Sequence, residues 1–170
     1  FTGCHESGIA SEKKYFEVTK DLTPDQRQDA NALTTFPPYY PDTPAAREDW
    51  KRNYELITAM DAWAGDLIAQ LKEDGLYENT IIFYWSDHGV GLPRGKRYVY
   101  ASGTHVPLIV SHPGAEAKVT ERLVSFVDFA PTTLSLAGIE PPAWMMGHAF
   151  DGAHEDAAQP FVFFHADRMD

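Results

Sequence analysis

Hydrophobic positions are most concentrated in a run of β-branched and aromatic residues from Ile81 to Trp85. The run is apolar at every position instead of alternating, which is typical of a strand buried on both faces within a parallel sheet. The polar residues Ser86–Gly89 follow at its carboxyl end, where open α/β sheets carry their binding sites. The pattern therefore predicts a buried strand that leads directly into a candidate binding site.

A long helix is predicted before this strand. Thr43 is a suitable N-cap, Pro44 suits the first helical position, and the helix extends to about Asp74, where Gly75 ends it in a left-handed conformation. One stripe at alternating steps of four and three is expected to be buried: Trp50, Tyr54, Ile57, Asp61, Ala64, Ile68 and Leu71. Asp61 is the polar member, and we expect neighbouring backbone or a cation to satisfy it.

Shorter elements are expected on both sides of this helix and strand. Residues Glu6–Leu33 are polar and weakly periodic, which predicts a loop with short helical turns, and the prolines of Thr34–Pro44 predict an extended strap. The later elements are strands at Val106–Ser111, Leu123–Val127 and Phe161–Phe164, and a helix that Asp128 caps, that runs through Leu136 and that Gly138 ends. The order of helix, short loop and strand predicts the α/β class, with part of a mostly parallel central sheet flanked by helices.

Composition narrows the class of protein. The 170 residues are 44% hydrophobic, which indicates one globular domain, and the net charge of -11 excludes nucleic acid as a partner. A single cysteine excludes an internal disulfide framework, and no apolar run reaches the ~20 residues of a membrane span. The chain does not open on a signal peptide, and both ends resemble strands, so we expect a fragment of a larger domain.

Asp87, His88 and Lys96 are the main candidates for chemistry. Side chains alternate along a strand, so an adjacent carboxylate and imidazole reach one metal only from irregular backbone, which Gly89 permits. Lys96 carries a mobile point charge that suits an anion held by such a metal. Taken alone, Ser86–Gly89 is also a common way to end a strand, and Lys96 also fits a solvated basic cluster, Arg94–Arg97.

Histidines and the cysteine supply weaker candidates. His5 is either an ordinary polar loop residue or part of the site if it converges with Asp87. His105, just before a strand, either lines the same cleft or caps the sheet edge. Cys4 fits a buried structural thiol better than a nucleophile, because its neighbour His5 points to the other face of a strand. Three histidines are expected in exposed turns: His112, His148 and His154.

Several blocks of the chain resemble one family. The residues Asn79–Gly89, Lys96 and Gly103–Val110 are similar to the C-terminal part of a sulfatase catalytic domain. Phe126–Ile139 resembles the helix that follows in sulfatases, and Met60 with Asp61 resembles their long helix. Two segments, Pro41–Arg47 and Leu92–Lys96, are similar to the heparan N-sulfatase (sulfamidase) branch. The resemblance covers essentially the whole chain.

The resemblance implies an alkaline phosphatase-like hydrolase with one divalent cation. Asp87 and His88 would be metal ligands, and calcium is expected first, with manganese or magnesium as alternatives because histidine suits softer ions. Lys96 would bind the sulfate oxygens, His5 would contact the sulfate or protonate the leaving group, and His105 would be a substrate contact. The substrate would be a sulfated small molecule or glycan, and the compartment periplasmic, extracellular or lysosomal.

One departure from the family pattern concerns the nucleophile. Sulfatases make formylglycine from the first residue of Cys-x-Pro-Ser-Arg or Ser-x-Pro-Ser-Arg, and Cys4–Gly8 does not match. The paired N-terminal aspartates of the metal site are also absent. We therefore expect residues 1–170 to be the C-terminal portion of a sulfatase-like catalytic domain that lacks its nucleophile-bearing part, and to be inactive alone. The alternatives are a phosphodiesterase or phosphonate monoester hydrolase of the same superfamily, or a non-catalytic binding domain.

Overall fold

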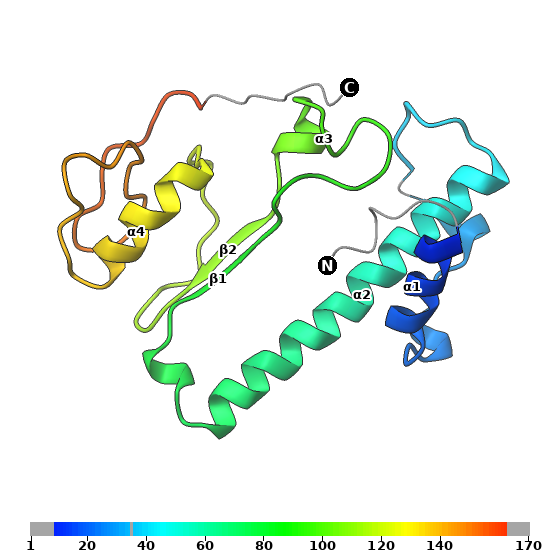
Figure 1. Cartoon of the computed structure of the whole chain (residues 1–170), viewed down its shortest axis with the longest axis horizontal. Helices are drawn as coiled ribbons and strands as arrows, with labels where there is room; N and C mark the ends of the chain where they lie inside the picture. Colours follow the sequence, from blue (N-terminus) through cyan, green and yellow to red (C-terminus); the bar gives the residue numbers. More distant parts are fainter. Residues whose placement is uncertain (1–8, 35, 163–170) are drawn as a thin grey trace. The chain divides into compact units, whose positions relative to one another are not determined.

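The computed structural model describes residues 9–34 and 36–162 of the chain. It divides into two units, Phe1–Ala115 and Glu116–Asp170, which are described separately. Figure 1 shows α1 (Ile9–Thr19), α2 (Pro44–Glu73), β1 (Ile82–Trp85), α3 (Ala101–Thr104) and β2 (Leu108–Ser111) in the first unit, and α4 (Phe129–Leu136) in the second. The described residues also contain short 3₁₀ helices at Pro24–Gln26, Ala30–Ala32, Tyr77–Asn79 and Phe126–Asp128.

The long helix α2 begins and ends as the sequence predicts. The Thr43 side chain accepts a hydrogen bond from the Ala46 N–H at 3.3 Å, and Pro44 occupies the first turn. Asp74 is the C-cap, and Gly75 follows with a φ of 70°. Left-handed backbone of this kind favours glycine, so the predicted caps are confirmed.

The predicted buried stripe of α2 is right only near its N-terminal end. Trp50 is buried, but Ile57 is 46% exposed and Asp61 is also exposed, so the expectation of a buried, satisfied Asp61 is wrong. The fully buried carboxylate of α2 is instead Glu55, at 0% exposure. A helix turns its residues by about 100° each, so Glu55 lies on a face next to the predicted stripe, and that face is the one that α1 covers.

The helix α1 replaces the first part of the segment Glu6–Leu33, which was predicted to be a loop with short helical turns. The 3₁₀ helices Pro24–Gln26 and Ala30–Ala32 in its second part agree with that prediction. The helix α1 is eleven residues long, and it packs against α2 (Figure 1). Tyr15 and Thr19, one turn apart, are its buried residues among the positions whose exposure is described. Its apolar periodicity is weak, which is why the sequence pattern did not reveal it; tertiary packing supplies most of its stability.

The two strands of the first unit pair antiparallel, with Ile82 opposite Ser111 and Trp85 opposite Leu108. The predicted mostly parallel sheet is therefore not confirmed in the described residues. Because the segment 86–107 contains only the short helix α3, it returns the chain to the end of β1 at which it left, and β2 runs back beside it. β1 is also only partly buried, with Trp85 48% exposed.

The second unit is built around the polar face of α4. Asp128, Thr132 and Ser135 are buried at helical spacing, and they accept hydrogen bonds from three backbone N–H groups of the following loop. The donors are His148 at 2.8 Å, Phe150 at 3.0 Å and His154 at 2.9 Å. Buried polar groups are thus paired with backbone, which holds the loop on the helix.

Two predictions for the second unit are corrected. Asp128 occupies the N-cap position of α4, but its carboxylate does not cap that helix; it accepts from the Ser125 N–H at 2.7 Å and from His148. The strand predicted at Leu123–Val127 is reduced to one bridge between Leu123 and Gln159, because a 3₁₀ helix begins at Phe126. Phe161 and Val162 are not in a strand, and the last two residues of that predicted strand, Phe163 and Phe164, lie outside the described residues.

Within residues 9–34 and 36–162, none of the helices combines the length and the apolar character that crossing a membrane requires.

Candidate functional site

The turn after β1 brings the side chains of Asp87 and His88 together. Asp87 Oδ2 lies 3.3 Å from His88 Nε2, and the other ring nitrogen, Nδ1, lies 2.7 Å from the Gly89 carbonyl oxygen. The Ser86 hydroxyl donates to the His88 carbonyl at 2.6 Å, which fixes the turn. The Asp87 carboxylate is exposed and the His88 ring is partly buried.

This geometry fits two ligands of one cation. Ligands bound at about 2.1 to 2.4 Å and at right angles around an ion lie roughly 3.0 to 3.4 Å apart, which includes the observed separation. A proton on His88 Nδ1 would be donated to the Gly89 carbonyl, which leaves Nε2 as the lone-pair donor beside the Asp87 carboxylate. The irregular backbone predicted for this pair is therefore present.

The pair does not make a complete metal site. In the described part of the chain, three or more His, Cys, Asp or Glu side chains do not gather in a way that could hold an ion. Divalent cations take four to eight ligands, so further protein ligands or water would be needed. Asp87 and His88 could supply only part of the coordination.

Lys96 lies in a tight loop that follows the Asp87–His88 turn. Its backbone N–H donates to the Val90 carbonyl at 2.8 Å, and the Gly95 N–H donates to Leu92 at 3.1 Å. Arg94 and Arg97, on either side of it, have φ angles of 65° and 71°. Left-handed conformations are uncommon for residues with a side chain, so the loop holds Lys96 in a strained and specific turn.

Three glycines lock this loop by close backbone approach. The Gly89 N–H donates to the Gly103 carbonyl at 3.0 Å, which brings the α3 segment beside the Asp87–His88 turn. A Cβ on Gly89 would overlap the Ser102 carbonyl oxygen, and one on Gly103 would overlap the carbonyl oxygens of Tyr98 and Gly95. Gly95 is equally crowded against the Val90 carbonyl. Only glycine fits at these positions, so the loop carrying Lys96 has one compact arrangement.

The remaining candidates are less well placed. His105 is the C-cap residue of α3, its N–H donates to the Ala101 carbonyl at 2.8 Å, and its side chain is exposed two residues after Gly103. It is thus carried by the same locked loop. His5 and Cys4 lie outside the described residues, so the proposed convergence of His5 with Asp87 stays a prediction.

Arg94 belongs to an aromatic cluster that the sequence interpretation did not identify. Its guanidinium carbon lies 4.8 Å from the ring centre of Tyr39 and 4.5 Å from that of Tyr100. The Tyr40 hydroxyl donates to the Pro93 carbonyl, so the proline-rich strap holds the loop at a second point. The prolines and tyrosines of the strap were a visible signal, but the sequence does not say which loop they contact.

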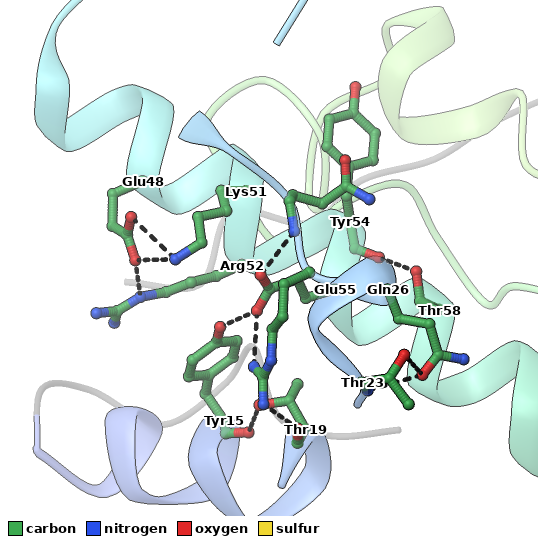
Figure 2. Close-up of polar contacts among 12 residues, drawn as sticks. Tyr15, Thr19, Thr23, Gln26, Glu48, Lys51, Arg52, Tyr54, Glu55 and Thr58 are labelled. Atoms are coloured by element: carbon green, nitrogen blue, oxygen red, sulfur yellow. Dashed lines mark hydrogen bonds and ion pairs between the residues drawn. The ribbon is translucent and has the colours of Figure 1, made fainter. Parts of the chain in front are cut away.

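Glu55 is a second feature that the sequence pattern did not reveal, and it is fully buried. Figure 2 shows its carboxylate as an acceptor at the contact between α1 and α2. The donors are the Tyr15 hydroxyl, Arg27 Nη1 at 3.1 Å and the Gln28 N–H at 3.0 Å. Burial alone would raise the pKa of Glu55, but these hydrogen bonds outweigh it and hold the pKa below its ordinary value. The carboxylate therefore stays charged and joins three segments of the first unit.

Comparison with known proteins identifies the family. The family model described as Sulfatase matches residues 1–139. An ulvan-active sulfatase of Formosa agariphila is 44% identical over 136 residues, which are 79% of this chain and 23% of that protein. N-sulphoglucosamine sulphohydrolase of Homo sapiens is 35% identical over 128 residues, 73% of this chain and 25% of that protein. Arylsulfatase K of Bos taurus is 35% identical over 101 residues, 56% of this chain and 19% of that protein.

These relatives confirm the resemblance drawn from the motifs, including that to the branch that hydrolyses N-sulfate. The chain spans about a quarter of the length of the first two relatives. The matched residues include the Asp87–His88 turn and the locked loop of Lys96, because the family model extends through both. This chain belongs to the sulfatase family.

Proposed function

We propose that the complete protein containing this chain is a metal-dependent sulfatase that hydrolyses sulfate esters or N-sulfates, with sulfated glycans as its substrate class. Family membership supports the reaction class, and relatives named for ulvan and for N-sulphoglucosamine support the glycan. The observation that carries the proposal is the pair of donor atoms on Asp87 and His88, 3.3 Å apart, at the head of the loop of Lys96.

Each residue has a distinct role in this proposal. Asp87 and His88 hold one divalent cation, calcium first and manganese or magnesium as alternatives. The bound cation supplies Lewis acidity that stabilises negative charge on the sulfate oxygens. Lys96 contributes a second positive charge at the same group, and the strained, glycine-locked turn keeps it in place as charge develops.

Two histidines complete the proposed contacts. His105 binds the substrate from the C-terminal end of α3. His5 contacts the sulfate or protonates the leaving group, as the family resemblance implies. Residues 1–170 form the C-terminal portion of the catalytic domain. The nucleophile and the other metal ligands come from segments outside these residues. Such an enzyme works in the periplasm, outside the cell or in a lysosome.

The test is turnover by the complete protein on a small aryl sulfate and on a glucosamine N-sulfate. Lys96→Ala is expected to cost about 2 to 4 kcal/mol of transition-state stabilisation, because a charge aimed at the transition state is lost. This corresponds to a kcat/KM that is lower by roughly 30- to 1,000-fold. Lys118→Ala, at an exposed lysine of the second unit, is the control and should keep wild-type kinetics. Wild-type kcat/KM in Lys96→Ala would overturn the proposed role.

A phosphodiester or phosphonate ester is the competing substrate, because an aspartate–histidine metal pair also suits phosphoryl transfer. The same assay with an aryl phosphodiester separates the two. Faster turnover of the phosphodiester than of any sulfate would show that the protein is a phosphodiesterase instead of a sulfatase. Absence of turnover on all of them, with substrate binding retained, would favour a binding domain.

A further inference from the structure

We propose that Arg94, held against the rings of Tyr39 and Tyr100, forms a subsite for a second anionic group, sulfate or carboxylate, on the sugar next to the one that carries the scissile sulfate. The inference rests on the proposed function and extends it from a single sulfate group to an oligomeric substrate. It concerns residues other than Asp87, His88 and Lys96.

Charge is segregated along the chain in a way that favours an anion at this loop. The chain carries 25 acidic residues, but residues 88–115 contain neither Asp nor Glu. The same stretch contains three basic residues within four positions: Arg94, Lys96 and Arg97. In a protein with a net charge of -11, this stretch carries no acidic side chain of its own to repel a negatively charged ligand.

Arg94 is fixed but its charge is not neutralised. Its guanidinium contacts the rings of Tyr39 and Tyr100, and among the described residues it makes no ion pair with a carboxylate. Cation–π contacts restrict the side chain while leaving it a full positive charge and its N–H donors. A planar guanidinium of this kind donates two parallel hydrogen bonds to a sulfate or carboxylate, and less entropy is lost because it is already ordered.

The neighbouring rings provide an apolar surface for a sugar. Tyr98 and Tyr100 are stacked, with centroids 6.0 Å apart and planes at 10°, and they are 52% and 51% exposed. The strap that carries Tyr39 is anchored to α2, because the Tyr40 ring packs edge-on against buried Trp50 at 5.5 Å. Exposed tyrosines offer a rigid apolar face and a polar tip, which suits the faces and hydroxyls of a sugar ring.

The alternative is that Arg94 only clips the loop to the strap. The Ser102 hydroxyl donates to the Arg94 carbonyl at 2.6 Å and the Tyr40 hydroxyl donates to Pro93, so the loop has other attachments that do not use the guanidinium. A clip would affect all substrates equally, because Lys96 would move. A subsite would affect only substrates long enough to reach it.

The experiment compares two substrates in the complete protein. One is a small aryl sulfate, and the other is a sulfated oligosaccharide with a second anionic group on the adjacent sugar. Arg94→Met is expected to raise KM for the oligosaccharide roughly 10- to 100-fold, the range expected for hydrogen bonds to a charged group, and to leave aryl sulfate kinetics within about twofold. Oligosaccharides whose second group is a sulfate, a carboxylate or a hydroxyl identify the group bound; the hydroxyl compound should not sense the substitution.

Lys72→Met is the matched control. Lys72 Nζ lies 4.8 Å from the Tyr77 ring, so this variant loses the same charge and the same kind of contact at the other end of α2. It should behave as wild type on both substrates. Equal losses on both substrates in Arg94→Met, or no loss on either, would overturn the subsite.

A second variant and a binding measurement test the subsite if Arg94→Met disturbs the loop or if the protein turns over no sulfate. If hydrogen exchange shows that Arg94→Met loosens residues 90–104, Tyr98→Ala takes its place, because Tyr98 stacks on Tyr100, whereas the Arg94 guanidinium stacks on Tyr39 and Tyr100. It should weaken only oligosaccharide turnover, and an unchanged KM would count against the subsite. If the wild-type protein turns over no sulfate, calorimetry with the intact oligosaccharide decides: binding lost in Arg94→Met supports the subsite while the proposed function fails, and unchanged binding overturns it.

Discussion

Gly103 lies where backbone from three parts of the Lys96 loop meets. A Cβ there would collide with the carbonyl oxygens of Tyr98 and Gly95, which are main-chain atoms that cannot rotate away. Gly103→Ala is therefore expected to destabilise the loop by about 1 to 3 kcal/mol, the usual cost of overpacking. Hydrogen exchange at the Lys96 amide measures it, because that N–H is bonded to the Val90 carbonyl.

A second glycine substitution serves as the control for this prediction. Gly65 lies inside α2 with open space around the position of a Cβ. Gly65→Ala should stabilise the helix by about 0.5 to 1 kcal/mol. Unchanged exchange at the Lys96 amide in Gly103→Ala would show that the loop is not locked there.

Asp87 carries the prediction for metal binding. In the complete protein, Asp87→Ala should lower the amount of divalent cation retained after desalting, because it removes the charged member of the donor pair with His88. Metal analysis of the purified variant, with circular dichroism to show that it is folded, is the measurement. Wild-type stoichiometry in a folded variant would remove Asp87 from the ligands.

For single residues, the sequence predicted a contact where the two contacting residues are adjacent in the chain. The Asp87–His88 turn follows from alternation and from Gly89, and the structure places the two donor atoms together. Arg94 was interpreted as one of a solvated cluster, because its partner Tyr39 is distant in the sequence. Glu55 was overlooked because an acidic residue next to an apolar stripe is usually exposed.

Glu55 joins secondary-structure elements through its charge. Glu55 itself lies in α2, and its hydrogen-bond donors come from α1 and from the segment that follows the 3₁₀ helix Pro24–Gln26 (Figure 2). Glu55→Gln should loosen α1 by roughly 2 to 3 kcal/mol, the cost of losing charge-assisted bonds at a buried site. Exchange of the Tyr15 and Thr19 amides reports this.

The matched control is a carboxylate on the surface of the same helix. Glu48 pairs with Lys51 and Arg52 at 3.4 Å and 3.1 Å and is partly exposed. Glu48→Gln should cost at most about 1 kcal/mol, as exposed ion pairs do. Equal effects of Glu48→Gln and Glu55→Gln would contradict the role given to Glu55.

The pH dependence of this contact has a defined sign. The folded-state pKa of Glu55 is below its ordinary value of 4.5, so its contribution is complete above that pH and is lost as the pH falls through the folded-state pKa. Burial and then Glu55 raise the pKa of Tyr15 above 10.0, so its contribution is present below pH 10.0 and is lost as the pH rises through the raised value. Protection of α1 should fall at both ends of the range, and Glu55→Gln should abolish the acid limb. An acid limb that persists in the variant would assign it elsewhere.

Among the elements, α2 was predictable because caps are local: Thr43, Pro44 and Gly75 define it. The direction of β2 was not, because pairing depends on the path of residues 86–107 and not on the apolar runs themselves. α1 was missed since the stabilising contacts described for it lie mainly outside the helix itself, with α2 and with Arg27.

For the whole molecule, we expect residues 1–170 alone to lack sulfatase turnover, even with calcium or manganese supplied. The sequence has no Cys-x-Pro-Ser-Arg segment to mature into a nucleophile, and Asp87 with His88 leaves an ion coordinated mainly by water. The assay uses a chromogenic aryl sulfate with the chain and with Cys4→Ser. Metal-dependent multiple turnovers that Cys4→Ser abolishes would refute this expectation.

The register of β1 and β2 brings together the two ends of the loop that carries Asp87, His88 and Lys96. Trp85 is paired directly with Leu108, so the chain enters and leaves the Lys96 loop at neighbouring points of one ladder. A synthetic peptide of residues 85–108, joined head to tail, would reproduce that closure with an ordinary amide bond. It would contain Asp87, His88 and Lys96 together with the glycines that interlock around them, but not the strap tyrosines. Such a macrocycle would allow metal and anion binding by this candidate site to be measured without the rest of the chain.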